Sequence, residues 1–306
     1  MLSIIPLLAS VPSSVIGGTP VMPGEWPDAV AVLSRTTACT GTLITPDVVL
    51  TAGHCIDDDP VIALVGSVDF GRPGGEPIRI RASLAYPDWE HTYDVGLVVL
   101  EHPASAPPRA IAAPCTARAE LIEDALVHLV GFGLTTRSGT GDNTRLHEAR
   151  IPVVDATCSD DRACNPRVSP GGEFTAGGDG PDACFGDSGG PVYLDTPAGP
   201  ALIGVVSRGE ALTDRPCGNG GVYVRADKVV SWIQRMTGET VARTRCTGAS
   251  DQDDPGASPR PVREADTADG GCDAGGGAGG TLVIALGVIT AAGLYRRRAS
   301  VDRSAR

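Results

Sequence analysis

The hexapeptide GDSGGP, residues 186–191, places one serine, Ser188, between glycines. Glycine has no Cβ, so the backbone on either side of this serine is free to turn sharply and to lie close to a bound molecule. A serine in such a turn is a candidate nucleophile, and it becomes reactive only when a general base lies beside it. The rest of the chain must therefore supply a histidine.

The position of the histidines decides which kind of hydrolase the chain resembles. The hexapeptide also fits the G-x-S-x-G elbow of α/β-hydrolases, in which the histidine of the triad follows the serine. In this chain every histidine precedes Ser188. The histidines are His54, His91, His102, His128 and His147. That order disfavours an esterase with an α/β-hydrolase elbow.

Two other short motifs supply a histidine and an aspartate ahead of the serine. TAGHC, residues 51–55, contains His54, and YDVGLVVL, residues 93–100, contains Asp94 at the start of an apolar run. A carboxylate in that position is costly unless it has hydrogen-bond partners. The order His54, Asp94, Ser188 therefore makes a candidate catalytic triad.

Together, these three motifs resemble those of the chymotrypsin/trypsin family of serine endopeptidases over residues 15–246. The resemblance implies an all-β fold of two six-stranded antiparallel β-barrels with a C-terminal helix. It implies that Ser188 attacks a peptide carbonyl, that His54 moves the proton, and that Asp94 orients the imidazole. The N–H groups of Gly186 and Ser188 would form the oxyanion hole. A protease-like binding module without catalysis is the alternative.

The resemblance also implies which residues select the substrate. Asp182 matches the acidic floor of the S1 pocket in trypsin-like members, so we expect protein or peptide substrates cleaved after Arg and, secondarily, Lys. A buried carboxylate rejects an uncharged side chain because it would be left unpaired. Ala183 has no hydroxyl to bind an ammonium group and favours Arg. Other matches to substrate-binding positions are Ser207, Gly209 and Gly221.

One residue of this region departs from the family. Arg208 stands where the family has a tryptophan that lines the subsites N-terminal to the scissile bond. Two interpretations stay open: Arg208 favours acidic substrate residues at those subsites, or it points into solvent. The segment from Ser207 to Cys217 is also longer than in trypsin, which leaves the rim of the pocket open.

Composition and apolar patterning agree with an all-β fold. The chain contains 40 Gly and 25 Pro, and aromatic residues make up only 4%. Short β-branched runs separated by turn residues predict strands. These runs include residues 29–33, 41–52, 61–66, 95–100, 126–133, 191–194 and 201–207. ADKVVSWIQRMTG, residues 226–238, predicts a helix with Val229, Val230, Ile233 and Met236 on its apolar face. The net charge of −12 argues against a nucleic-acid partner.

Eight of the nine cysteines lie before residue 247. Their spacing is not that of a zinc site, and we expect disulfides in an exported protein. The family resemblance implies the pairs Cys39–Cys55 and Cys184–Cys217. Thr175 stands where the family partner of Cys158 would be, so we expect Cys158–Cys164 and, from the remaining residues, Cys115–Cys246. Asp69 and Glu76 are too weak a signal for a calcium site, and no cofactor or metal is expected.

The N-terminal segment predicts export. Residues 1–14 have an apolar centre followed by small residues, which is typical of a secretory signal, although the basic start is missing. A disordered or buried segment is the alternative. VIGG, residues 15–18, resembles the N-terminus that proteolysis creates in this family, where the new α-amine of Val15 would pair with Asp187. Because Ser14 is not basic, we expect signal peptidase or another protease to create this end.

The C-terminal region predicts attachment to a surface. Residues 247–280 lack aromatic residues and apolar runs, as in a disordered linker. Residues 281–295 are apolar, and the Gly/Ala run before them extends the stretch to about 20 residues, enough for a membrane helix. The basic residues 296–306 would remain cytoplasmic. Cys272, the apolar stretch and the arginines resemble the sorting tails of myxobacterial surface proteins, in which the cysteine is processed. An ordinary tail anchor is the alternative, and we expect a monomer.

Overall fold

The structure is a computed structural model that describes residues 15–141, 143–159, 163–178, 180–210 and 215–246. The expected signal segment, linker, hydrophobic helix, Cys272 and basic tail lie outside these residues. Within the described ranges, no helix is both long enough and apolar enough to span a membrane.

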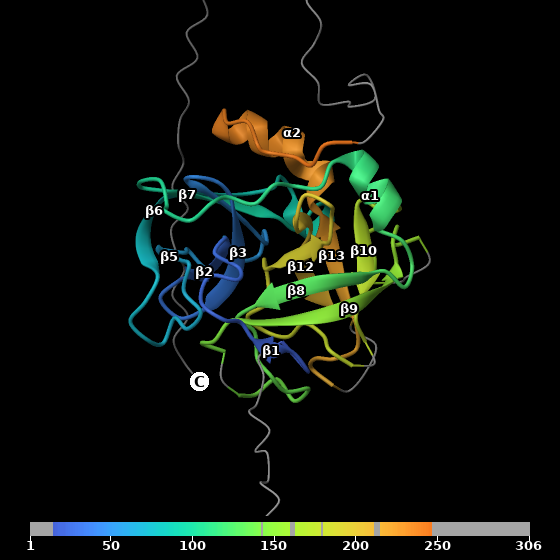
Figure 1. The fold of residues 1–306 in the computed structure, drawn as a ribbon, viewed down its shortest axis with the longest axis horizontal. Coiled ribbons are helices and arrows are strands. Elements are labelled where there is room, and N and C mark those ends of the chain that lie inside the picture. Colours follow the sequence, from blue (N-terminus) through green and yellow to red (C-terminus); the bar gives the residue numbers. More distant parts are fainter. Residues whose placement is uncertain (1–14, 142, 160–162, 179, 211–214, 247–306) are drawn as a thin grey trace, which may run out of the picture. The chain divides into compact units, whose positions relative to one another are not determined.

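The first β-barrel is closed and is drawn in blue to teal in Figure 1. Its strands pair in the order β2-β3-β4-β7-β6-β5, and β5 closes the ring on β2. The β-branched runs of the sequence fill the interior, where Val30, Leu43, Val49 and Val98 are fully buried. The strands are β2 (Ala29–Leu33), β3 (Ala38–Thr45), β4 (Val48–Thr51), β5 (Ile62–Val65), β6 (Glu76–Ala85) and β7 (Gly96–Leu100).

The second barrel follows along the chain. Strand β8 pairs with both β9 and β11, so the order β8-β9-β10-β13-β12-β11 closes into a ring of six. The short strand β1 (Thr19–Pro20) adds to the end of β9. The strands of the ring are β8 (Leu126–Gly131), β9 (His147–Asp155), β10 (Glu173–Ala176), β11 (Pro191–Leu194), β12 (Ala201–Gly209) and β13 (Gly221–Arg225). The chain therefore has the two six-stranded antiparallel barrels expected from its sequence.

A C-terminal helix, α2 (Ala226–Thr237), follows β13 directly. It buries Val229, Val230 and Ile233 and ends at Gly238, whose φ of 74° allows the left-handed cap. Met236, which the spacing placed on the same face, is 49% exposed in the last turn. Two shorter helices were not predicted. They are η1 (Trp89–His91) and α1 (Pro114–Glu120).

A buried polar cluster joins the two barrels. Asp28, at the start of the first barrel, is fully buried and accepts a hydrogen bond from Arg109 Nε at 3.0 Å. Tyr193 Oη in β11 donates to the same carboxylate at 2.6 Å. The Arg109 guanidinium lies 5.0 Å from the centre of the Tyr193 ring. A charge buried at this depth is tolerated because it is paired and hydrogen-bonded.

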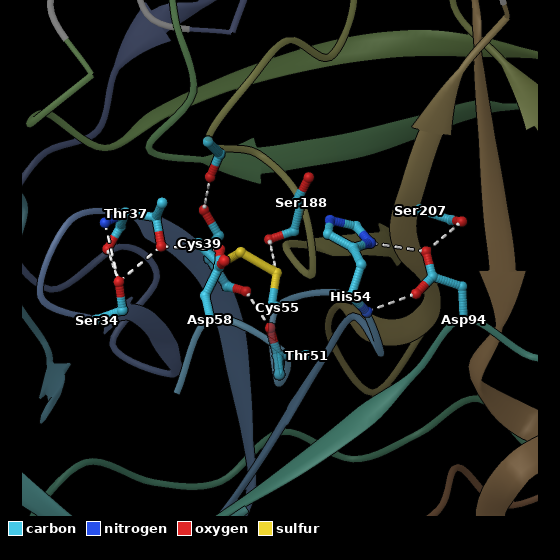
Figure 2. Close-up of a disulfide and its surroundings, with 12 residues drawn as sticks. Ser34, Thr37, Cys39, Thr51, His54, Cys55, Asp58, Asp94, Ser188 and Ser207 are labelled. Atoms are coloured by element: carbon cyan, nitrogen blue, oxygen red, sulfur yellow. Dashed lines mark hydrogen bonds and ion pairs between the residues drawn. A yellow bond between two sulfur atoms is a disulfide. The ribbon is translucent and has the colours of Figure 1, made fainter. Parts of the chain in front are cut away.

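Four disulfides pair the eight cysteines that the structure describes, as is typical of proteins made for an oxidising compartment. The Cys39–Cys55 bridge ties β3 to the loop that carries His54 (Figure 2). The other bridges are Cys115–Cys246, Cys158–Cys164 and Cys184–Cys217.

Candidate active site

His54 and Asp94 face each other from the loop after β4 and the segment before β7 (Figure 2). His54 Nδ1 lies 2.9 Å from Asp94 Oδ2, and the backbone N–H of His54 donates to Oδ1 at 3.0 Å. A carboxylate only accepts hydrogen bonds when ionised, so Nδ1 carries the proton and Nε2 is the free base. This tautomer lets the ring take a proton on its other side.

Asp94 is only 7% exposed and has a third donor in the second barrel. Ser207 Oγ, in β12, donates to Asp94 Oδ2 at 2.7 Å. Burial raises the pKa of Asp94, but the hydrogen bonds from His54 and Ser207 outweigh it and leave the pKa below its usual value. Burial lowers the pKa of His54, and the bond and charge of Asp94 more than compensate, so this pKa is raised. The pair is therefore ready to stabilise an imidazolium.

Ser188 and His54 line the same cavity, which has a volume of about 490 Å³. Figure 2 shows the Ser188 side chain beside the imidazole ring of His54. In the described part of the chain no hydrogen bond joins Ser188 Oγ to His54 Nε2. Such bonds are often long in substrate-free enzymes and tighten when substrate binds.

The loop that carries Ser188 is held by Thr40 of β3. The Thr40 N–H donates to the Ser188 carbonyl at 2.8 Å, and Thr40 Oγ1 donates to the Gly186 carbonyl at 2.8 Å. The N–H groups of Gly186 and Ser188 have no acceptor among the residues that the structure describes. Gly186 has a φ of 99°, which favours glycine. Two unpaired N–H groups this close together can bind an anionic oxygen.

Asp182 is 1% exposed and lies beside the wall of this cavity. Its Oδ1 accepts the Ala183 N–H at 2.8 Å, and its Oδ2 accepts the Gly220 N–H at 2.6 Å. Burial raises the pKa of Asp182 to about 6, although both backbone hydrogen bonds lower it. Ala183, Gly209 and Gly220 line the cavity.

Gly221 has a different environment from the one expected. The wall glycine in its part of the cavity is Gly220, and Gly221 is not among the described residues that line the cavity. A Cβ at Gly221 would lie 2.8 Å from the hydroxyl oxygen of Tyr223. The need for glycine here therefore comes from packing against a buried tyrosine in β13.

The segment that begins at Val15 is docked into the second barrel. Val15 is fully buried, and Ile16 pairs with Asp182 through backbone hydrogen bonds of 2.9 and 3.0 Å. Asp187, next to Ser188 in the sequence, is also fully buried and accepts the N–H groups of Gly133 at 2.8 Å and Cys184 at 2.9 Å. Burial raises the pKa of Asp187 to about 7. Within the described chain, no cationic side chain pairs with this carboxylate.

Arg208 lines the same cavity as His54 and Ser188, and its side chain is partly exposed. Its guanidinium points at Glu173 of β10 and forms an ion pair with it at 2.8 Å. Glu173, Thr40 and Gly220 are the site residues that sequence reasoning missed. The signal for Glu173 was Arg208 itself, because an arginine that replaces a large apolar residue in a partly buried position requires an acidic partner.

The two carboxylates weighed for calcium have other partners. Asp69 Oδ2 lies 3.1 Å from Arg72 Nε and 3.5 Å from Arg145 Nε. Glu76 Oε2 accepts the Ser105 N–H at 2.8 Å. These contacts neutralise the charge of Asp69 and occupy an oxygen of Glu76.

Comparison with known families agrees with this architecture. A family model described as trypsin matches residues 15–233, which include both barrels, His54, Asp94 and Ser188. The match extends over most of the chain and ends inside α2. The match supports the fold and class of a serine protease. It does not by itself show activity, because proteins with the trypsin fold include inactive members. On this match and on its two closed barrels, the chain belongs to the trypsin family.

Proposed function

We propose that this protein is a serine endopeptidase that hydrolyses peptide bonds after Arg and, secondarily, Lys. The observation that carries the proposal is the paired geometry of Asp94, which binds His54 and Ser207 at the edge of a cavity that also contains Ser188. A binding module that has lost catalysis would be expected to lack one of these groups or to block the cavity. None of the described residues at the site points to such a loss.

The first half of the reaction follows from this geometry. As Ser188 Oγ forms a bond to the carbonyl carbon, its proton passes to His54 Nε2, and the π electrons move onto the carbonyl oxygen. The N–H groups of Gly186 and Ser188 receive that oxyanion. Asp94 stabilises the imidazolium. The C–N bond then breaks, and the amine leaves with the proton from Nε2.

The second half repeats these steps with water. His54 takes a proton from water as the water oxygen attacks the acyl-enzyme carbonyl, and the same two N–H groups hold the oxyanion. The C–O bond to Ser188 breaks, and Ser188 Oγ recovers its proton from Nε2. No cofactor takes part in either half.

Asp182 supports the preference for a cation at P1. Its carboxylate is nearly closed off from solvent, and backbone groups of Ala183 and Gly220 hold it in place. A guanidinium or ammonium that reaches the end of the cavity would form an ion pair with this carboxylate. An apolar side chain there would leave a buried carboxylate unpaired. We therefore expect a lower kcat/KM for substrates with an apolar P1 residue than for substrates with Arg or Lys.

Export is part of the proposal. The four disulfides fit an oxidising compartment. We infer that the mature protein is secreted or tethered to the cell surface through its C-terminal tail, after removal of the segment before Val15. The membrane, reached through that tail, would then be its second partner besides protein substrates.

Keeping Ser14 on the mature chain is expected to lower kcat/KM by about 10²- to 10⁴-fold. The α-amine of Val15 would otherwise pair with the buried Asp187, and losing one member of such a pair costs about 3–5 kcal/mol. Steady-state kinetics on chains that begin at Ser14 or at Val15, with the start verified by mass spectrometry, measures the effect. Asp187→Asn should show a similar loss when Val15 is the first residue. Equal activity of the two starts would contradict the pairing.

Cleavage of an unbiased peptide library tests the proposed specificity. The protein beginning at Val15 is expected to cut mainly after Arg, then after Lys, with the cut sites read by mass spectrometry. Cuts spread evenly over apolar P1 residues would overturn the role of Asp182 while leaving the protease function. Absence of any cut, with the fold intact by circular dichroism, would favour the binding module.

A further inference from the structure

Arg208 is fixed by a buried partner. Its Nη1 lies 2.8 Å from Glu173 Oε1, and its Nη2 lies 3.0 Å from Glu173 Oε2. The Glu173 side chain is completely buried, whereas 36% of the Arg208 side chain is exposed. A planar guanidinium joined to a carboxylate at both ends is held in a single orientation. The direction of Arg208 is therefore set from inside the second barrel.

The donors of Arg208 are all in use. Besides the two bonds to Glu173, Nη1 donates to Ser207 Oγ at 3.1 Å. Nε and Nη2 donate to the Ala163 carbonyl at 3.2 and 2.7 Å. A guanidinium has five N–H groups, and these five bonds account for them. Arg208 lines a cavity of about 350 Å³ beside Asp94, but no donor remains for an acidic group of a substrate.

The bond to Ser207 links Arg208 to the reaction centre. Ser207 Oγ accepts from Arg208 and donates to Asp94 Oδ2, which in turn lies against His54 Nδ1. A hydroxyl has one hydrogen and rotates to suit its partners. With a donor on one side, that hydrogen is directed toward the carboxylate. A continuous chain of polar contacts thus runs from Glu173 to His54.

We propose that Arg208, held by Glu173, is a positioning residue for Asp94 and His54: it orients the Ser207 hydroxyl and sets the charge beside the aspartate. This inference rests on the proposed protease function, because it concerns the same site. In this role Arg208 does not contact the substrate. The Arg208–Glu173 pair would replace the tryptophan of the family with a polar support for the triad.

The charges of the pair oppose each other at His54. The guanidinium is the nearer member and disfavours the imidazolium, and the Glu173 carboxylate behind it offsets that effect. Removing one charge at a time should therefore move the pKa of His54 in opposite directions. Other ionisable groups around this region are unchanged in the variants below. Asp57, Asp58 and Asp94 act on His54, and Glu90, His91 and Arg167 line the cavity beside Asp94. Glu210 lines the cavity that contains Ser188. Tyr93 interacts with Glu173, Arg225 and Asp227.

The test is an NMR titration of His54 in the full chain, which needs no turnover. Glu173→Gln is expected to lower the pKa of His54 by about 0.3–0.5 units, and Arg208→Gln to raise it by a similar amount. Arg167→Gln is the matched control. Arg167 lines the same cavity, but it is 62% exposed and pairs with Asp88, so its removal should leave the pKa unchanged within error.

If a single variant fails to fold, a double variant tests the same proposal. The double variant Arg208→Gln/Glu173→Gln removes both charges and keeps two amides of similar size. Its His54 pKa should lie near that of the wild type, and its kcat should fall by about 2- to 10-fold with KM unchanged, because the ordered bond to Ser207 is lost. An unchanged kcat with a raised KM would overturn the positioning role.

Three further outcomes bear on the inference. Shifts of the same sign in Glu173→Gln and Arg208→Gln, or no shift in either, would overturn it. A change in preference for acidic substrate residues in Arg208→Gln, without a shift of the His54 pKa, would show that Arg208 contacts the substrate. If the opposite shifts occur but the wild type cleaves no peptide, the protease function fails while the positioning role stands.

Discussion

Replacing Ser188 with alanine is expected to lower kcat for an Arg-linked peptide by about 10⁵- to 10⁶-fold, the loss typical of removing the nucleophile from a Ser-His-Asp triad. The variant keeps the N–H groups of Gly186 and residue 188, so a small residual rate over the uncatalysed reaction should remain. Steady-state and overnight assays of the protein beginning at Val15 measure the two rates.

Ser138→Ala is the matched control for this loss. Ser138 is exposed in a loop and its hydroxyl contacts only Thr136 and Thr140 among the described residues, so its removal should leave kcat unchanged. Ser188→Ala should still bind an arginine-based competitive inhibitor with the wild-type affinity, which shows that the cavity is intact. A Ser188→Ala enzyme within tenfold of the wild type would mean that another group is the nucleophile.

Replacing Asp182 with serine is expected to lower kcat/KM for Arg-linked peptides by about 10³- to 10⁵-fold, because the bound cation loses the buried carboxylate that pairs with it. Hydrolysis of Phe- or Leu-linked peptides should fall far less, since no buried carboxylate is left unpaired. Parallel kcat/KM measurements on peptides that differ only at P1 give the two ratios. Asp195→Ser, which changes an exposed aspartate paired with Arg150, should leave both values unchanged.

The same carboxylate gives the preference a pH dependence. Burial raises the pKa of Asp182 to about 6 in the free protein, so its neutral form dominates below that pH and its anion above it. The ratio of kcat/KM for Arg-linked to Leu-linked peptides should rise as the pH increases through about 6, and Asp182→Ser should remove the rise. A flat ratio between pH 5 and 7 in the wild type would show that Asp182 does not control P1.

Much of the fold could be predicted because several strands are continuous apolar runs in the sequence. The stretches that became β2, β5, β7 and β12 are buried on both faces, so they contain almost no polar residue. Strand β6 carries Arg79 and Arg81 and is mostly exposed, which hides it from a search for apolar runs. Strand β9 buries every second residue, but it contains Pro152, a residue that argues against a strand in the sequence. Helix α1 spans only seven residues, too few for a periodic signal.

The site shows the same division between local and tertiary information. His54, Asp94 and Ser188 lie in short motifs in which the neighbouring glycines and cysteines are part of the pattern. These three residues could therefore be found from the sequence. Thr40 holds the loop that carries Ser188 across 146 residues of chain, and no local pattern marks it. Glu173 meets Arg208 across 35 residues, through the closing of the second barrel. Arg208 indicates that an acidic partner exists, but which residue it is follows only from the strand pairing of the barrel, as does the contact of Thr40.

The central claim is that Ser188 is a nucleophile activated by His54 in an Arg-selective site. The most direct measurement is to treat the protein beginning at Val15 with a peptide phosphonate that carries arginine at P1, and to map the adduct by mass spectrometry. The account predicts one adduct per chain, on Ser188, formed much faster than with the matching phenylalanine phosphonate and absent in His54→Ala on the same timescale. No adduct on the folded protein, or an adduct on another residue, would contradict it.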